Sequence, residues 1–411
     1  MSRALAQPRR DTSAPPSSLV RITCSEGGQI NDRAGAGLPI RSTTGSVPGP
    51  RAPKPLVLVF STPFSTMNLD ATYPSPFPTS DPILGLIGNT PMIPYPGDDA
   101  LNLFCKLETE NPTRSMKDRI AMGILSDALS GAETNGREVD TVVEASSGNT
   151  AGSIALVARR LGTECHVTCP ETTSAHKIGY MRAYGANVHL CPSVGSDHPD
   201  HYRQTARRLA DEMDGAFLVD QYHNLSNPGV HARWTGPEIW KQAGPEMTHL
   251  VCAMGTGGIM SGTARAVKEK AEAAGTEVRT VGVDATDSNI STAFYGEDPV
   301  PYDTSVEGLG KGFELPTMWF DVIDEMRDVD DERAFRIARR SAQEYGFLVG
   351  PSAGAALAVG LDIARENPDA RVVTIICDGG EQYFDTLFAP DADASEADGA
   401  RETETASAGE V

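Results

Sequence analysis

Lysine is scarce in this sequence, and long apolar runs are absent. Of the 35 basic residues among 411, eight are lysines and the rest are arginines. No stretch approaches the ~18 consecutive apolar residues that a membrane-spanning helix needs, which argues against a membrane protein. The opening residues MSRALAQPRR lack the apolar core of a signal peptide. We therefore predict a cytoplasmic protein that makes no contact with a membrane.

The net charge of −21 is distributed unevenly along the chain. Residues 1–66 carry eight basic and three acidic side chains, a charge of +5, so residues 67–411 carry −26. So acidic a body argues against nucleic acid as a partner, because a polyphosphate backbone repels it. The acidic, lysine-poor composition favours a high-salt cytoplasm, and acidity alone also fits an ordinary cytosol.

Neither the cysteines nor the histidines form a recognisable metal-binding pattern. The seven cysteines include no CxxC pair, and most lie in apolar runs, so we predict buried, reduced thiols. The histidines of DHPDH (197–201) fall in a predicted loop with no third ligand in view, so we predict solvent-exposed side chains and no metal site. The cysteines are Cys24, Cys105, Cys165, Cys169, Cys191, Cys252 and Cys377.

The two ends of the chain differ in composition from the rest. Residues 1–66 are rich in Ser, Pro, Gly and Arg, which predicts a disordered extension. Alternatively, the change in charge sign near Met67 indicates that translation starts at Met67. A third interpretation of residues 1–66 is an organelle transit peptide. Residues 391–411 hold seven acids against Arg401, which predicts a solvated acidic tail.

Between these ends, strand and helix patterns alternate. A first series covers residues 101–191, and a second begins near residue 217 with FLVD. This alternation predicts an α/β fold of two doubly wound, mostly parallel sheets with helices on both faces, and ligands at the carboxyl ends of the strands. We assign residues 67–110 plus 225–390 to a large cofactor-phosphate domain and 111–224 to a small mobile domain. Predicted strands cover LFCKLE (103–108), 139–145, 165–170, 188–191, 248–254, 278–284 and 371–380, and predicted helices include 120–129, 174–184, 263–272 and 331–345.

The segment NPTRSMKDR (111–119) places Lys117 where a helix begins. A proline and polar residues end the preceding apolar run, and the apolar-periodic segment IAMGILSDAL (120–129) follows. A helix N-terminus disfavours a cation and suits a neutral, nucleophilic amine, such as one that forms a Schiff base with an aldehyde cofactor. Taken alone, Lys117 is better explained as a solvated surface lysine.

The loop GTGGIMSG (255–262) lies between a predicted strand and a predicted helix. Its glycines allow backbone amides to point at an anion, and the helix N-terminus adds a favourable potential, so a phosphate fits. The loop is neither a Walker A motif nor a GxGxxG fingerprint. A tight structural turn explains it equally well.

Two further loops introduce apolar helices. In SSGNT (146–150), exposed amides and hydroxyl groups suit a carboxylate, and Asn149 could hold a phenolic or carbonyl oxygen. An N-capping box would explain one serine there but not four polar side chains together. In GPSAG (350–354), spacing alone favours Ser352 as an ordinary N-cap.

Taken together, these motifs resemble the pyridoxal-phosphate enzymes of the cysteine synthase and cystathionine β-synthase family, which have the tryptophan synthase β-like fold (fold type II). The resemblance covers residues 80–388, nearly all of the predicted folded part. Several motifs are weak singly, but nine in order are very specific. They are IGNTP, NPTRSMKDR, EASSGNT, MRAYGANV, DQYHNLSNPGVHARWTGPEIW, GTGGIMSG, EGLGKGF, GPSAG and CDGGEQYFDT.

The resemblance implies a role for each matching residue. Lys117 would be the Schiff-base lysine and the base that removes the Cα proton. Asn149 would bond to the 3′-oxygen of pyridoxal 5′-phosphate, and Ser352 would face its ring nitrogen. The cofactor phosphate would be bound by Gly255, Thr256, Gly257 and Gly258. The substrate would be bound through its carboxylate by Ser146, Ser147, Thr150 and Gln221, and through its amino group by the loop around Gly308.

The implied reaction is β-replacement on serine or an O-activated serine. A serine facing the ring nitrogen leaves the ring a weak electron sink, which favours loss of a β-leaving group over transamination and gives an aminoacrylate. A thiol or sulfide then adds to it. Cysteine synthesis from O-acetylserine and sulfide is our first interpretation, and cystathionine synthesis from serine and homocysteine is the second. The rivals are a threonine synthase, a serine/threonine dehydratase and a non-catalytic, cofactor-bound interaction partner.

The resemblance also implies a homodimer, and a serine acetyltransferase is a partner to consider. One departure from the family pattern is Ile259, which stands where the family has Thr or Ser in the phosphate loop. The change removes one hydroxyl contact and predicts weaker cofactor binding.

Overall fold

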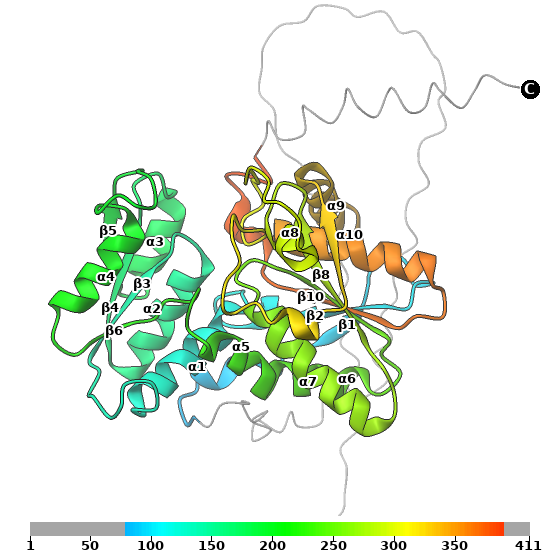
Figure 1. Ribbon diagram of the computed structural model, residues 1–411, viewed down its shortest axis with the longest axis horizontal. Coiled ribbons are helices and arrows are strands. Elements are labelled where there is room, and N and C mark those ends of the chain that lie inside the picture. Colours follow the sequence, from blue (N-terminus) through cyan, green and yellow to red (C-terminus); the bar gives the residue numbers. More distant parts are fainter. Residues whose placement is uncertain (1–78, 390–411) are drawn as a thin grey trace, which may run out of the picture. The chain divides into compact units, whose positions relative to one another are not determined.

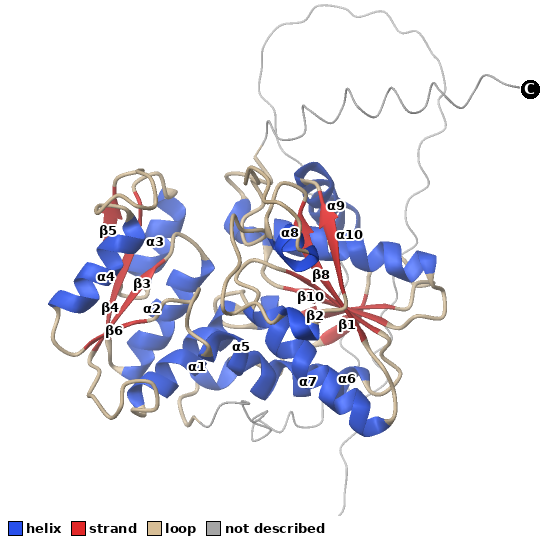
Figure 2. Ribbon diagram, in the orientation of Figure 1, coloured by secondary structure: helices blue, strands red, loops and turns tan. Residues whose placement is uncertain are grey.

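A computed structural model describes residues 79–389 of the chain. The predicted extension (1–66), the alternative start at Met67 and the acidic tail (391–411) lie outside the described residues. Figure 2 shows the strands in two groups, each flanked by helices. None of the helices in the described part is long and apolar enough to cross a membrane.

The larger sheet has six strands in the order β1-β2-β10-β7-β8-β9. Only the edge strand β1 is antiparallel to its neighbour, and the other pairings are parallel. The fold therefore belongs to the predicted α/β class (Figure 1). The strands are β1 (Met92–Pro94), β2 (Leu103–Leu107), β7 (His249–Ala253), β8 (Arg279–Ala285), β9 (Glu325–Val329) and β10 (Val372–Ile376).

Helices cover both faces of this sheet, so both faces are buried. Successive side chains of a strand point to opposite faces, so neighbouring residues belong to different apolar clusters. On β10, Val372 and Ile376 belong to one apolar cluster, and Val373 and Ile375 belong to another. The first cluster includes side chains of α9 (Asp331–Tyr345) and α10 (Pro351–Glu366). The second includes side chains of α6 (Gly236–Ala243) and α7 (Gly258–Ala274), and the short α8 (Ile290–Tyr295) contacts β9.

The smaller sheet has four parallel strands in the order β5-β4-β3-β6. Val142 on β3 packs in the cluster of α2, whereas the next residue, Val143, packs against Ala206 of α4. The strands are β3 (Thr141–Ala145), β4 (Glu164–Pro170), β5 (Asn187–Cys191) and β6 (Ala216–Leu218), and the helices are α2 (Asn149–Leu161), α3 (Ala175–Ala183) and α4 (Tyr202–Glu212).

One strand assignment from the sequence is wrong. We expected FLVD, near residue 217, to open the second series, but β6 pairs with β3 of the smaller sheet. The strand has only three residues, so its hydrogen bonds to β3, rather than any periodicity of its own, determine where it lies. The helix expected over 263–272 also begins earlier, at Gly258.

Two helices lie next to elements of both sheets. α1 (Lys117–Leu129) packs against α2 and α5 (Ser226–Val230), and α5 packs against α7. A π-helical turn, His231–Thr235, links α5 to α6. The strand membership of the two sheets is compatible with a large and a small domain, but the proposed division and the mobility of 111–224 stay predictions.

Candidate active site

A cavity of about 300 Å³ lies at the carboxyl ends of β3, β7 and β10. This is the edge at which parallel α/β sheets bind ligands. All but one of the residues predicted from the sequence line it. Gly258 does not, because it is the first residue of α7 and its Cα faces Asn227. The lining residues include Lys117, Ser146, Ser147, Asn149, Thr150, Gln221, Gly255, Thr256, Gly257, Gly308 and Ser352.

Lys117 is the first residue of α1, as predicted. The preceding amide, of Met116, donates a hydrogen bond to the Cys377 carbonyl (2.9 Å), which fixes the start of the helix beside the end of β10. Burial lowers the pKa of Lys117 below its ordinary value of 10.5, and the charge of Lys311 lowers it further, against the opposing effect of Asp378. Within residues 79–389 its Nζ makes no hydrogen bond or ion pair. Lys117 therefore presents an amine that loses its proton more easily than an ordinary lysine and that no described group engages.

The loop between β7 and α7 has no room for side chains at its glycines. A Cβ added to Gly255 would lie 2.3 Å from the Gly308 carbonyl oxygen, and one on Gly257 would lie 2.4 Å from Cγ of Met318. Gly257 also has a φ of 78°, a left-handed conformation that favours glycine. The loop Gly255–Gly257 therefore brings its backbone close to the cavity just before α7, and a backbone so placed suits a bound phosphate.

The loop between β3 and α2 is tied to a chain of buried polar groups. The Thr150 hydroxyl donates to Oε1 of Gln221 (2.7 Å), and Nε2 of Gln221 donates to Oε1 of Glu144 (3.1 Å). The Gly148 amide donates to Ser146 Oγ (3.3 Å). These contacts hold the loop so that its hydroxyls and amides line the cavity, where they can bind a carboxylate.

Asp378, which the sequence analysis did not name as a site residue, orients Asn149. Its Oδ2 accepts hydrogen bonds from Asn149 Nδ2 (2.7 Å) and from the Tyr383 hydroxyl (2.5 Å). Its Oδ1 is buried and has no partner among the described residues. Burial raises the pKa of Asp378 to about 6, against the lowering effect of these two bonds. An acid directly after a buried strand, in CDGGEQY, was the available sequence signal.

Ser352 and the loop around Gly308 form another wall of the cavity. Ser352 is the second residue of α10, and a Cβ on Gly308 would lie 3.7 Å from its Oγ. Gly308 has a φ of 83°, and the nearby Gly310 amide donates to the Met254 carbonyl (2.8 Å). The same loop carries Glu307, whose Oε1 lies 2.5 Å from Nζ of Lys177 in α3. The loop is therefore anchored to β7 on one side and to α3 on the other.

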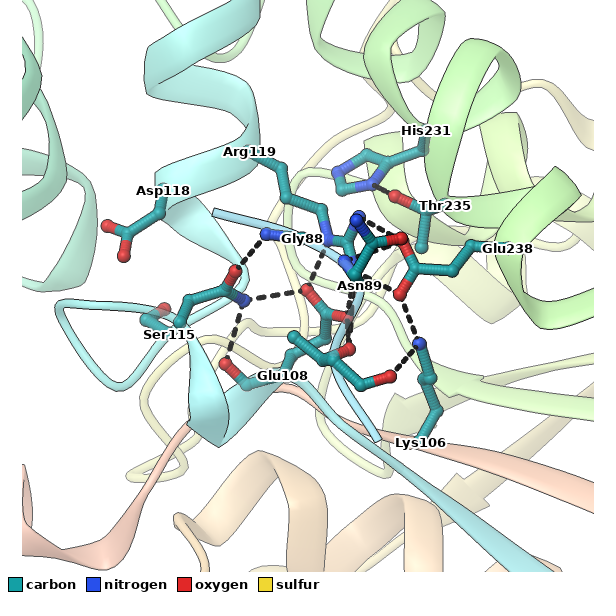
Figure 3. Close-up of polar contacts among 12 residues, drawn as sticks. Gly88, Asn89, Lys106, Glu108, Ser115, Asp118, Arg119, His231, Thr235 and Glu238 are labelled. Carbon is teal, nitrogen blue, oxygen red and sulfur yellow. Dashed lines mark hydrogen bonds and ion pairs between the residues drawn. The ribbon is translucent and has the colours of Figure 1, made fainter. Parts of the chain in front are cut away.

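A buried group of charged side chains, shown in Figure 3, lies beside the first turn of α1 and includes Arg119 of that helix. Arg119, two residues after Lys117, lies 2.6 Å from Oε2 of Glu108 through its Nε and 2.9 Å from Oε2 of Glu238 through its Nη1. Lys106 also pairs with Glu238 and donates to the Thr90 carbonyl (2.6 Å). The sequence analysis missed this group, although charged residues inside the apolar strand LFCKLE were a signal.

The described cysteines follow the prediction. Six of the seven are buried and form no disulfide among the described residues, and Cys24 lies outside them. Ile259 lines the cavity with a buried, apolar side chain. The weaker cofactor binding expected from it stays a prediction.

Comparison with known protein families and sequences gives consistent matches. A family model described as pyridoxal-phosphate dependent enzyme matches residues 83–378. Cysteine synthase 1 of Neurospora crassa is 33% identical over 317 residues, which cover 74% of this chain and 82% of that protein. Cysteine synthase of Staphylococcus aureus strain Mu50 is 33% identical over 311 residues, 74% of this chain and 96% of that protein.

Solved structures with a similar fold include two enzymes. The first is a hydrogen sulfide-producing enzyme from Fusobacterium nucleatum, with a TM-score of 0.66 and 28% identity, covering 74% of this chain and 98% of that one. The second is O-ureido-L-serine synthase, with a TM-score of 0.67 and 30% identity, covering 77% of this chain and 100% of that one.

Proposed function

Because the chain belongs to the pyridoxal-phosphate-dependent enzyme family, we propose that it catalyses β-replacement on an O-activated serine, with sulfide as nucleophile and L-cysteine as product. The observation that carries the proposal is the meeting of a reactive lysine, a glycine loop and a hydroxyl-rich loop at one cavity. The proposed donor is O-acetylserine, and the proposed acceptor is sulfide.

The residues around the cavity fit pyridoxal 5′-phosphate. The loop Gly255–Gly257, in which a Cβ would collide with neighbouring groups, leaves its backbone amides free for the phosphate. Asn149, held by Asp378, would offer its side-chain amide to the ring oxygen of the bound cofactor, and Ser352 would offer a neutral hydroxyl to its ring nitrogen. The bound cofactor would supply an electron sink for carbanion chemistry at Cα of the substrate.

Lys117 is proposed to attach the cofactor and later to act as base. Its lowered pKa keeps more of the amine unprotonated near neutral pH, so Nζ can accept the proton from Cα of the substrate. Ser352, being a hydroxyl rather than a carboxylate, does not favour a protonated ring nitrogen. That choice supports loss of a β-leaving group over transamination.

The loop between β3 and α2 is proposed to bind the substrate carboxylate. Ser146 and Ser147 line the cavity wall with their hydroxyls, and the Thr150 hydroxyl, which donates to Gln221 Oε1 (2.7 Å), holds Gln221 at the same wall. The loop around Gly308, across the cavity, is proposed to close over the amino group. Binding at both ends of the amino acid orients Cα toward Lys117.

The proposed reaction is tested by identifying its product. We expect the purified protein, supplied with pyridoxal 5′-phosphate, to show a visible absorption band and to form L-cysteine from O-acetylserine and sulfide, detected by mass spectrometry. Cystathionine formed from serine and homocysteine, without cysteine synthesis, would favour the second interpretation. If no visible absorption band forms even after cofactor is supplied, both interpretations would be contradicted. A non-catalytic binding partner would then be favoured.

The glycine loop gives a second, structural test. Replacing Gly255 by alanine is expected to weaken cofactor binding by about tenfold, because its Cβ would lie 2.3 Å from the Gly308 carbonyl oxygen and overpacking commonly costs ~1–3 kcal/mol. Equilibrium dialysis of the cofactor measures the effect. Gly179→Ala is the matched control, since nothing lies within 4 Å of a Cβ there. Equal affinity in the two variants would contradict the proposed phosphate site.

The proposal extends to location and assembly. A cytoplasmic location is proposed, and it is compatible with the finding that none of the described helices could span a membrane. A homodimer is also proposed, which would cover the exposed apolar side chains of Ile83 and Leu86 beside a surface groove. A serine acetyltransferase that supplies O-acetylserine is the proposed further partner, and adaptation to high salt is proposed from the net charge of −21.

A further inference from the structure

Lys311, in the motif EGLGKGF, has a fixed backbone and a side chain at the cavity. Its amide donates to Ser288 Oγ (2.8 Å), and its carbonyl accepts from the Ser288 hydroxyl (3.1 Å) and the Asn289 amide (2.7 Å). With the main chain held on both sides, the side chain lies among the residues that line the cavity. Lys311 is therefore built into the wall and is not a mobile surface lysine.

The ammonium group of Lys311 has no acidic partner among the described residues. Its Nζ lies 5.4 Å from the ring centroid of Tyr222, and Arg203 lies 4.7 Å from the same centroid. Asp284 attracts it, but that carboxylate already accepts bonds from the amides of Ala285, Ile290 and Ser291. Burial lowers the pKa of Lys311 to about 8, which leaves it mainly protonated at pH 7.

Apart from Lys117, which is proposed to attach the cofactor, the other lysines near the site have acidic partners. Lys177 pairs with Glu307 and Lys106 pairs with Glu238. Lys311 is half-buried, and a cation partly withdrawn from water without a counter-charge is costly, so a site that keeps one is expected to receive an anion during its working cycle. The residues proposed for the cofactor phosphate (255–257) and for the substrate α-carboxylate (146–150 and Gln221) belong to other segments, so Lys311 is available for a third anion.

We propose that Lys311 binds an anionic group on one of the two reacting partners, and so determines which substrates are used. This inference rests on the proposed β-replacement. The group is either a phosphate leaving group on serine or the carboxylate of an amino-acid thiol. In the first case the Cβ–O bond breaks, inorganic phosphate leaves with the bonding electrons, and sulfide sulfur forms the Cβ–S bond. In the second case the activating group leaves with the electrons of the Cβ–O bond, the thiol gives up its proton, and the thiol sulfur forms the Cβ–S bond.

The test compares charged and neutral substrates in the holoenzyme. The first comparison is between two donors that differ in the leaving group, O-phosphoserine and O-acetylserine, each supplied with sulfide. The second is between a thiol that carries a carboxylate, homocysteine, and one that does not, 2-mercaptoethanol, each supplied with the better of the two donors. Lys311→Met removes the charge, Lys311→Arg retains it, and Lys268→Met is a matched control, because Lys268 pairs with Asp324 outside the cavity. The readout is the ratio of kcat/KM for the charged substrate to kcat/KM for its neutral counterpart.

We expect Lys311→Met to lower this ratio by at least about tenfold for one of the two comparisons, since a charge-assisted hydrogen bond is lost. Lys311→Arg should restore most of the ratio, and Lys268→Met should not change it. A change confined to the donors assigns the anion to a phosphate leaving group, and a change confined to the acceptors assigns it to a thiol carboxylate. Unchanged ratios in Lys311→Met would overturn the proposal while leaving cysteine synthesis intact.

A binding measurement separates this proposal from the proposed function. Titration calorimetry of the holoenzyme with inorganic phosphate, and separately with acetate, requires no turnover. We expect at least one anion to bind the wild type about tenfold more tightly than Lys311→Met. Loss of bound cofactor from Lys311→Met, together with unchanged anion affinity, would place Lys311 at the cofactor phosphate and overturn the inference.

Discussion

Replacing Lys117 by alanine is expected to lower kcat by at least about a thousandfold, because both the cofactor attachment and the base would be lost. Lys117 opens α1 at the cavity, and its Nζ is free of hydrogen bonds within the described residues. Lys117→Arg should be equally inactive, since a guanidinium stays protonated. Steady-state kinetics gives the effect, and circular dichroism checks that the fold is retained. Turnover near the wild-type rate in either variant would contradict the proposed mechanism.

Lys117 should also lower the free energy of unfolding of the protein, and this effect can be measured independently of catalysis. The pKa of Lys117 is lowered in the folded protein, so the unfolded chain binds more protons between the folded pKa and 10.5. The destabilisation is therefore full below the folded pKa and fades as pH rises toward 10.5. In cofactor-free protein, Lys117→Met should have a higher free energy of unfolding than the wild type at neutral pH, and the difference should shrink as the pH rises toward 10.5. An unchanged difference would contradict the shifted pKa.

Much of the fold could be predicted where local signals agree with the tertiary structure. The helix expected over 331–345 has those bounds because Asp330 caps its start, accepting from the Arg333 amide, and Gly346 ends it with a φ of 65°. β6 could not be placed, because a three-residue strand derives its position from pairing with β3. The early start of α7 was missed because Gly258 and its neighbours have no apolar period.

The candidate site was predictable to a similar extent, and for related reasons. Loops that follow strands and precede helices reveal their chemistry in short motifs, so SSGNT and GTGG were found. Asp378 and Lys311 lie in motifs that were quoted, but a sequence does not show which side chain faces the cavity or lacks a partner. Arg119 was read as part of a helix start, since its partners Glu108 and Glu238 come from distant segments.

Replacing Arg119 by methionine is expected to cost about 3–5 kcal/mol of unfolding free energy, the range found when one partner of a buried ion pair is removed. Arg119 is fully buried, and its guanidinium contacts both Glu108 and Glu238 (Figure 3). Without it, Lys106 alone would face two buried carboxylates. Urea denaturation at pH 7 measures the loss. Because Arg119 follows Lys117 by two residues, kcat should fall as well.

The pH dependence of this loss identifies its electrostatic origin. Burial raises the pKa of Glu108, but the charge and hydrogen bonds of Arg119 outweigh it and hold the pKa at about 2, against an ordinary 4.5. A carboxyl group with a lowered folded pKa contributes stability above its unfolded pKa and loses it as pH falls toward the folded value. The difference between wild type and Arg119→Met should therefore be largest near pH 7 and shrink below pH 4.5. Arg233→Met is the matched control, because its exposed pair with Asp127 is worth only ~0–1 kcal/mol. A loss in Arg119→Met no larger than in Arg233→Met, or one independent of pH, would show that packing rather than charge holds α1 and Lys117 in place.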